Sequence, residues 1–512
     1  MNGNKYLHLI KTIFITGFAF IINYGINLVL TPFITNNVGT EAYGFVSLAK
    51  QFAQYATIIT TALNSFASRY ITIEYHKGDK GKSNEYFNSV FFGDLALGSF
   101  ICIIAFSLIA FLEKLINIPD DLIHDVKFLF LFVFINFWIT TVFTVFSSAA
   151  FIVNKLDLVG LFKGLSYLTE AIVLYIIYVL FPAKVFFVGI GLIAASLIVA
   201  ISNVWMSRKY TSDIYVQKKS FSLKAVKRLV LDGIWTSVNS LGNLLNNGLD
   251  LIVCNLLLSS LAMGQVAIAK TIDSIFHSLY QLVAQTFQPM FLKSYATNDR
   301  KKLLDDLKMS MKISGLFSNL AFAGFLALGL VYYELWIPNQ DIILIYRITI
   351  ITILTSISAG PMNPLYYIYT LTVKKVIPCI ITLIGGVCNV VGMYFLITYT
   401  NMGVYAIVWT TAIVMSVINF ITNPLYMAYS LKLPWHIFYP NIIKNVISCL
   451  VLSIAFKGFT MLYLPDSWIT LILCIIIYAC IGSFLHFVIV FGKEDWSKLI
   501  KYVRIVVTAR EK

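Results

Sequence analysis

Two lysines occupy equivalent places inside apolar segments of this sequence. Lys50 ends the segment 42–50 (AYGFVSLAK), and Lys270 ends the segment 262–270 (AMGQVAIAK), 220 residues further on. A lysine at the centre of a bilayer costs about 2.5–3.5 kcal/mol, so it should face protein or water. One interpretation is a pair of cations that flank a cavity and attract an anion. The other is that each lysine reaches the outer interface along its own flexible side chain.

Further ionisable residues accompany these lysines. Asp273 and His277 follow Lys270 at spacings of three and four, so on a helix all three share one face. Asp250 lies on the preceding apolar segment, and Glu170 lies near the middle of the fifth. A carboxylate beside a lysine and a histidine can carry a coupling proton or sodium ion. Equally, Asp273 can neutralise Lys270 as a buried pair, and a partner on another helix would make Glu170 structural.

The composition indicates that these residues lie in an integral membrane protein. The chain has 512 residues, of which 59% are hydrophobic and 12% charged, whereas a soluble domain averages roughly 25% charged residues. Continuous apolar runs such as 471–490 favour helices, because a membrane barrel would show short alternating strands. We therefore expect an all-α integral membrane fold with about 14 transmembrane helices. The expected spans are 11–35, 43–70, 87–112, 127–152, 158–181, 184–206, 231–257, 262–290, 311–335, 342–371, 376–398, 403–427, 439–463 and 468–491.

The basic residues predict the topology. Most of them fall in alternate loops, which places both termini in the cytoplasm of a multi-pass protein of the cytoplasmic (inner) membrane. The net charge of +14 is explained by these loops and does not indicate nucleic-acid binding. The longest basic loop separates the two copies of the repeat, as expected for two parallel lobes, and its charge favours contact with anionic lipids. The predicted parts are an N-terminal six-helix lobe (1–206), a basic linker (207–230), a C-terminal six-helix lobe (231–430), an extra helix pair (431–492) and a basic, amphipathic tail (493–512).

Several functional classes are disfavoured by the sequence. It has no P-loop motif for ATP hydrolysis, no metal-ligand cluster and no soluble segment long enough for a catalytic domain, so we expect no cofactor and no enzyme activity. Seven cysteines are scattered through apolar segments and are interpreted as small core residues. A broken helix is expected at 360–364 (GPMNP), as in many transporters, although Pro is tolerated in static spans too.

Polar amides recur on the first and seventh spans. They are dense enough to hydrate a cavity wall and to contact sugar hydroxyls, but they also suit polar contacts between helices. They are Asn23, Asn27, Asn239, Asn243, Asn246 and Asn247.

The first two spans resemble a known group of proteins. The segments 27–33 (NLVLTPF), 38–44 (VGTEAYG) and 68–70 (SRY) are similar to those of polysaccharide flippases of the multidrug/oligosaccharidyl-lipid/polysaccharide exporter superfamily. The second copy departs from the first, because 38–41 becomes 258–261 (LSSL) and Arg69 aligns with Pro289. The resemblance implies a V-shaped pair of lobes around a central cavity.

The resemblance also implies a function and a set of partners. The expected substrate is an undecaprenyl-pyrophosphate-linked oligosaccharide that moves from the inner to the outer leaflet for O-antigen, capsule or other surface polysaccharide such as lipopolysaccharide. The polysaccharide polymerase and assembly proteins are the further partners implied. Arg69, at the inner end of the second span, either binds the substrate diphosphate first or simply follows the positive-inside rule. The expected substrate-binding residues are Lys50, Lys270, Arg69, Asn23, Asn27, Asn243 and Asn247, and the expected ion-coupling residues are Asp273, Asp250, Glu170 and His277.

Three other functions remain open on the residues alone. A drug/cation antiporter of the same superfamily would favour carboxylates in its cavity, so the two lysines disfavour it. A lipid II flippase is compatible with the lysines. A polymerase or ligase would need a large outer loop, and the outer loops are short.

Overall fold

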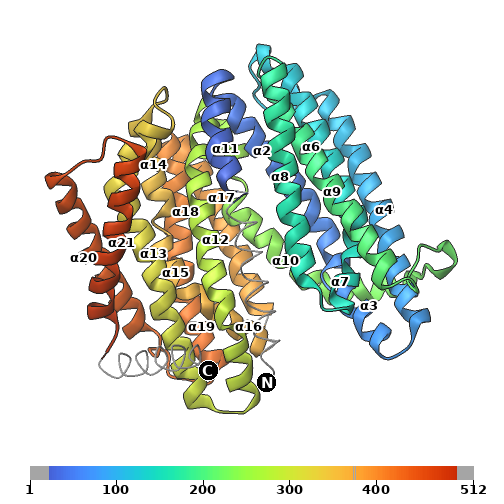
Figure 1. Ribbon diagram of the computed structural model, residues 1–512. Coiled ribbons are helices and arrows are strands. Elements are labelled where there is room, and N and C mark those ends of the chain that lie inside the picture. Colours follow the sequence, from blue (N-terminus) through green and yellow to red (C-terminus); the bar gives the residue numbers. More distant parts are fainter. Residues whose placement is uncertain (1–21, 23, 373, 375, 493–512) are drawn as a thin grey trace. The chain divides into compact units, whose positions relative to one another are not determined.

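The computed structural model describes residue 22, residues 24–372, residue 374 and residues 376–492, and within these ranges every regular element is a helix. The all-α prediction is therefore confirmed. The chain divides into two compact units, Met1–Ile268 and Ala269–Lys512, and the long helix α12 (Ser260–Ala296) crosses from one to the other. Figure 1 labels the helices.

In unit 1 the long helices α4, α6, α9 and α8 run side by side (Figure 1). Helix α6 packs against both α4 and α9, and α9 packs against α8, while α10 lies along α2. Residues 24–37 are helical as well. The elements of unit 1 are α2 (Thr40–Asn64), α3 (Ala67–His76), α4 (Lys80–Ala110), α5 (Leu112–Leu115), η1 (Asp120–Leu122), α6 (Ile123–Phe143), η2 (Thr144–Ser147), α7 (Ser148–Ile152), α8 (Leu156–Leu180), α9 (Phe187–Tyr210), η3 (Lys218–Ser220), α10 (Leu223–Asn247), α11 (Asp250–Leu257) and the start of α12.

The two copies of the sequence repeat meet within unit 1 at their glycines. A Cβ atom placed on Gly264 would lie 2.3 Å from the carbonyl oxygen of Thr40, and one placed on Gly44 would lie 2.9 Å from the Cα of Gly264. A real Cβ cannot approach backbone atoms so closely, because both distances are below van der Waals contact. The glycines of the repeat are therefore required where α2 and α12 come into contact.

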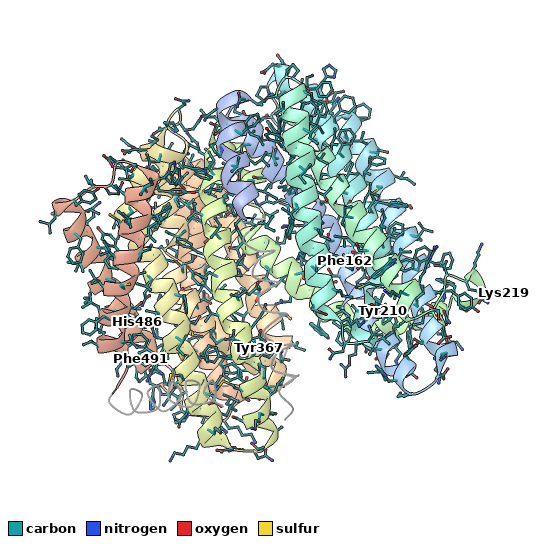
Figure 2. All side chains as sticks on the ribbon, in the orientation of Figure 1. Phe162, Tyr210, Lys219, Tyr367, His486 and Phe491 are labelled. Carbon is teal, nitrogen blue, oxygen red and sulfur yellow. The ribbon has the colours of Figure 1, made fainter. Side chains whose placement is uncertain are left out.

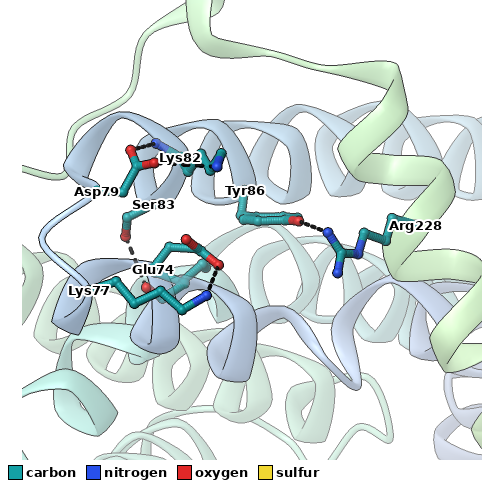
Figure 3. Close-up of polar contacts among 8 residues, drawn as sticks. Glu74, Lys77, Asp79, Lys82, Ser83, Tyr86 and Arg228 are labelled. Atoms are coloured by element: carbon teal, nitrogen blue, oxygen red, sulfur yellow. Dashed lines mark hydrogen bonds and ion pairs between the residues drawn. The ribbon is translucent and has the colours of Figure 1, made fainter.

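Polar side chains form hydrogen bonds where α3, α4 and α10 meet (Figure 3). Asp79 caps α4 by accepting a 2.9 Å hydrogen bond from the backbone N–H of Lys82. This bond, with the nearby Lys82 ammonium, lowers the pKa of the Asp79 carboxyl. Ser83 donates to the carbonyl of Ile71, and Arg228 of α10 donates to the Tyr86 hydroxyl at 3.2 Å. The start of α10 is thus held directly to α4.

The connection between α9 and α10 is shorter than the predicted linker 207–230, because α9 continues to Tyr210 and α10 begins at Leu223. Two asparagines of α4 hold this connection by hydrogen bonds to its backbone N–H and C=O groups. The Asn84 side chain donates to the carbonyl of Asp213 and accepts from the N–H of Tyr215, and Asn88 repeats this pattern one step further along. Lys219, labelled in Figure 2, is exposed on this connection.

Unit 2 is organised around α13, which packs against α14, α15, α20 and α21. His486 of α21, labelled in Figure 2, is fully buried, where its ring contacts the Ser448 hydroxyl and the carbonyl of Lys312. The predicted extra helix pair therefore packs onto the unit 2 core. The elements are α13 (Arg300–Trp336), α14 (Ile342–Ile353), α15 (Ser356–Met362), η4 (Asn363–Tyr366), α16 (Tyr367–Leu371), α17 (Val376–Tyr399), α18 (Val404–Val417), η5 (Ile418–Thr422), α19 (Asn423–Ser430), α20 (Tyr439–Leu462) and α21 (Trp468–Val490).

Several predicted boundaries can be compared with the helices. The expected break at 360–364 is present, since α15 gives way there to the short helix η4. The predicted span 43–70 is interrupted after Asn64, where α2 ends and α3 begins. In the described residues ten helical stretches are long and apolar enough to cross a membrane. The helices α2, α10 and α12 are not among them, and residues 1–21 and 23 lie outside the description, so the count of fourteen stays a prediction.

The predicted lobes and the two compact units divide the chain at different residues. The prediction separates the lobes at 207–230, whereas the contacts join α10 and α11 to unit 1, because α10 packs along the length of α2. The predicted tail 493–512 lies outside the described residues.

The cysteine interpretation is wrong at two positions. Five of the seven are buried as expected, but Cys388 and Cys480 are exposed. Both lie on the strongly apolar helices α17 and α21, whose outer faces are not covered by other described residues, so an apolar surrounding at these sites does not mean a protein core.

The glycine contact predicts a test of stability. Gly264→Ala should lower the apparent melting temperature of the detergent-solubilised protein, because overpacking against the Thr40 carbonyl costs about 1–3 kcal/mol. Gly324→Ala in α13 is the matched control, since a Cβ there meets open space and alanine favours a helix by about 0.5–1 kcal/mol. Equal melting temperatures for the two variants would show that the Gly264 contact is not tight.

Candidate functional site

A polar cavity of about 340 Å³ lies in unit 1 between α2 and α10. None of the residues that line it carries a charge, and most offer an amide or a hydroxyl. From α2 these are Gln51, Gln54, Tyr55, Thr57, Ile58 and Thr61, and from α10 and its end they are Ser240, Asn243, Leu244, Asn247 and Gly248.

The helical spacing of these polar residues places those of α2 on one wall of the cavity and those of α10 on the other. On α2 the polar positions 54, 57 and 61 recur every three to four residues, and on α10 the positions 240, 243 and 247 do the same. Residues at such spacing lie on one face of a helix. Asn243 and Asn247 are both exposed, as expected of residues that line an open cavity. The prediction that these two amides face a cavity is consistent with their position here.

Tyr55 links the two walls of the cavity. Its hydroxyl donates a hydrogen bond to the carbonyl of Gly248. Gly248 follows the last residue of α10, and carbonyl groups at the end of a helix lack the N–H partner that the next helical turn would supply. Asp250, the first residue of α11, is buried and acts electrostatically on Tyr55. Asp250 thus belongs to the broken helix beside the cavity and lies in unit 1.

Lys50 lies next to the cavity wall and has a carboxylate near it. It precedes Gln54 by four residues, so it continues the cavity face of α2 by one turn, but it does not line the cavity itself. Glu170 of α8 is 6% exposed, and Lys50 acts on it electrostatically. Tyr167 of the same helix also interacts with Glu170. Two residues that were predicted for separate roles are therefore within electrostatic range of each other, without a hydrogen bond or salt bridge between them in the described part of the chain.

The second copy of the repeat presents its own polar face on α12, in unit 2. Lys270, Ser274, His277 and Gln281 stand at the positions that correspond to Lys50, Gln54, Thr57 and Thr61 of α2. Ser274, His277 and Gln281 are exposed and Lys270 is half-buried. Asp273 is half-buried and acts electrostatically on the buried Tyr280. Lys270, Asp273 and His277 share one helix, as predicted.

The remaining predicted residues have different positions. Asn23 lies outside the described residues. Asn27 is half-buried, and its carbonyl accepts a 2.8 Å hydrogen bond from Thr31. Arg69 is exposed on α3, with its guanidinium 6.0 Å from the ring centre of Phe66, and does not line the cavity.

Most of the α2 wall was missed from the sequence. The predicted site did not include Gln51, Gln54, Tyr55, Thr57 and Thr61, although a spacing of three and four residues between polar positions was a usable signal. Another missed feature is Asp94 of α4, which is fully buried and accepts a 2.8 Å hydrogen bond from Asn64 of α2. Its partner lies 30 residues away in the chain, so spacing could not reveal it.

Neither the cavity nor its surroundings hold an obvious metal site. Among the described residues no group of three or more His, Cys, Asp or Glu side chains could hold a metal ion. The chemistry available is hydrogen bonding by neutral groups, with the cation Lys50 and the carboxylates Glu170 and Asp250 beside the cavity.

The Lys50–Glu170 interaction predicts non-additive stability. Lys50→Gln and Glu170→Gln should each lower the apparent melting temperature, because each removes one member of this electrostatic attraction, while the double variant should lose less than the sum. The coupling is expected at about 0.2–1 kcal/mol, since within the described residues the two side chains share no hydrogen bond or salt bridge. Lys114→Gln, a change at an exposed lysine of unit 1, controls for loss of charge alone. Strictly additive losses would refute the interaction.

This chain is similar in sequence to known membrane proteins. The model of a family described as polysaccharide biosynthesis proteins matches residues 9–295. A membrane protein of Bacillus subtilis (strain 168), EpsK, which is described as uncharacterized, is 25% identical over 492 residues that cover 95% of this chain and 96% of the relative.

Solved structures show a similar fold. The lipid II flippase MurJ in an inward closed conformation matches with a TM-score of 0.63 at 16% identity, over 92% of this chain and 98% of that one. An inward-facing multidrug resistance transporter of the MATE family, from the MOP superfamily, matches with a TM-score of 0.61 at 15% identity, over 80% and 95%. The resemblance found in the first two spans is thereby confirmed. Because the family match covers more than half of the residues, this chain belongs to the polysaccharide biosynthesis protein family and has the fold of the MOP superfamily transporters.

Proposed function

We propose that this protein flips an undecaprenyl-pyrophosphate-linked oligosaccharide across the cytoplasmic membrane for surface polysaccharide assembly. The observation that carries the proposal is the uncharged, amide- and hydroxyl-lined cavity between α2 and α10. Amides and hydroxyls both donate and accept hydrogen bonds, so they match the hydroxyls of a sugar in many orientations. A drug/cation antiporter should instead present carboxylates, and none lines this cavity.

The size of the cavity fits part of such a substrate. At about 340 Å³ it is at the small end of the 300–1,000 Å³ that is usual for ligand sites. It therefore suits a few sugar groups of the headgroup at a time, while the polyprenyl chain stays in lipid. The polar face of α12 is proposed to serve the same purpose in unit 2.

The charged groups suit the diphosphate and its coupling. Lys50 continues the cavity face by one turn, so it is placed to attract a diphosphate that follows the sugars. Such an anion would compete with Glu170 for the lysine, which makes Glu170 the candidate carrier of a coupling proton. Lys270 with Asp273 and His277 is the corresponding candidate in unit 2, where a sodium ion is the alternative to a proton.

The proposal can be tested by the lipid-linked oligosaccharide pool of a strain that lacks this protein. The wild-type gene should relieve the accumulation of the inner-leaflet precursor, whereas Gln54→Leu/Asn243→Leu should not. Each lost hydrogen bond contributes about 0.5–1.5 kcal/mol, so the double variant should reduce transport roughly 5- to 100-fold. Asn37→Leu, an exposed amide of unit 1 outside the cavity, should behave as wild type.

The outcomes separate the rival functions and the roles of the lysines. Accumulation of lipid II instead of an oligosaccharide precursor would favour a lipid II flippase. An unchanged pool with altered drug sensitivity would favour the antiporter. Full relief by Lys50→Gln/Lys270→Gln would leave flipping in place and remove the lysines from it.

A further inference from the structure

A second cavity, of about 610 Å³, lies in unit 2, apart from the site described above. Its walls come from α13, α14, α18 and the connection that leads into α18. The lining residues are Leu326, Tyr346, Arg347, Ile350, Ile351, Asn401, Met402, Tyr405 and Trp409. This cavity contains one charged residue, Arg347, and three aromatic side chains.

Arg347 has no counter-charge among the residues that the structure describes. It is exposed, and within the described residues its guanidinium makes neither a hydrogen bond nor an ion pair. Arg347 is the sixth residue of α14, about 8 Å along the axis from the start of the helix, and the loop at that end is predicted to lie outside. An arginine at this depth is stabilised by water or by an anion, because neutral groups and hydrocarbon do not compensate its charge.

Neutral hydrogen-bonding groups surround the arginine. Asn401, the hydroxyl of Tyr405 and the indole N–H of Trp409 line the same cavity, and none of the three has a side-chain hydrogen bond within the described part of the chain. The ring of Tyr346 is fixed, because its hydroxyl donates to the carbonyl of Leu326 at 2.7 Å. These groups form a wall rich in donors.

The rest of the lining is apolar. Leu326, Ile350 and Ile351 present only hydrocarbon to the cavity, so a fully hydrated free ion would be poorly matched there. The combination of a guanidinium, further donors and hydrocarbon fits a molecule with an anionic head and an apolar body. A guanidinium binds phosphate oxygens through two parallel hydrogen bonds, which makes phosphate the best matched head.

We propose that this cavity binds the phosphate headgroup of an amphiphile that enters from the outer leaflet, with Arg347 as its anion ligand. Two sources share this chemistry, namely a membrane phospholipid and a polyprenyl phosphate. The inference does not depend on the proposed function, because it rests on residues of unit 2 that take no part in the polar cavity of unit 1.

The test is native mass spectrometry of the purified full-length protein in detergent, titrated with matched lipid pairs. Phosphatidylglycerol and diacylglycerol of the same acyl chains differ by the phosphate headgroup, as do polyprenyl phosphate and polyprenol. At least one phosphate-bearing lipid should bind about tenfold or more tightly than its neutral counterpart, and Arg347→Gln should abolish this difference.

Two further variants make the result specific. Lys457→Gln removes a charge from an exposed position of α20 in the same unit and should leave binding unchanged. Arg347→Lys keeps the charge without the planar fork and should bind with intermediate affinity.

Each outcome decides the proposal. Preference for phosphatidylglycerol identifies a membrane lipid as the source, and preference for polyprenyl phosphate identifies the carrier lipid. Equal binding of phosphate-bearing and neutral lipids, or an Arg347→Gln variant that binds as wild type, would overturn the proposal. Loss of binding in Lys457→Gln as well would overturn it too, since general surface charge would then be responsible.

Discussion

The close contact of α2 with α10 and with the start of α12 determines where a cavity can form in unit 1. The helices α2 and α10 run antiparallel, with Ser237 donating to the carbonyl of Ile58 at 2.9 Å. Nearby, a Cβ on Gly233 would lie 1.9 Å from the carbonyl of Ala62, so these backbones almost touch. At the other end Gly264 meets Thr40. The polar cavity lies between these two tight contacts, where side chains and not backbone separate the helices.

This arrangement explains why the cavity helices are too polar to be recognised as ordinary spans. A membrane helix that faces lipid must be apolar, whereas one that faces an aqueous cavity can carry amides and hydroxyls. Among the long helices in the described part of the chain, α2, α10 and α12 lack a stretch that is apolar and uncharged enough to cross a membrane, and α2 and α10 line the cavity of unit 1. The low hydropathy of α2 and α10 and the presence of the cavity therefore have the same physical cause, namely contact with water or with a hydrated substrate.

The sequence predicted the fold well and the candidate site in part, for physical reasons. Apolar runs located most helices, because hydrophobic length is a local property that the bilayer imposes. Asn243 and Asn247 were singled out because polar residues are rare in spans, but Gln54 and Thr57, which line the same cavity, were not. Interactions between distant segments, such as the electrostatic effect of Lys50 on Glu170 and the hydrogen bond of Asn64 to Asp94, could not be predicted, since a single sequence carries no information on which helices become neighbours.

The two copies of the repeat each carry a lysine at the equivalent position, Lys50 and Lys270, but the surroundings of these lysines differ. In unit 1 the carboxylate near Lys50 comes from another helix, so the interaction joins α2 to α8. In unit 2 the nearest carboxylate in sequence, Asp273, is one turn from Lys270 on the same helix. A pair within one helix moves as a rigid body, whereas a pair between helices changes whenever the helices shift. The energy of the attraction between Lys50 and Glu170 therefore depends on how α2 and α8 are packed, so a change in that packing would change the environment of both charges.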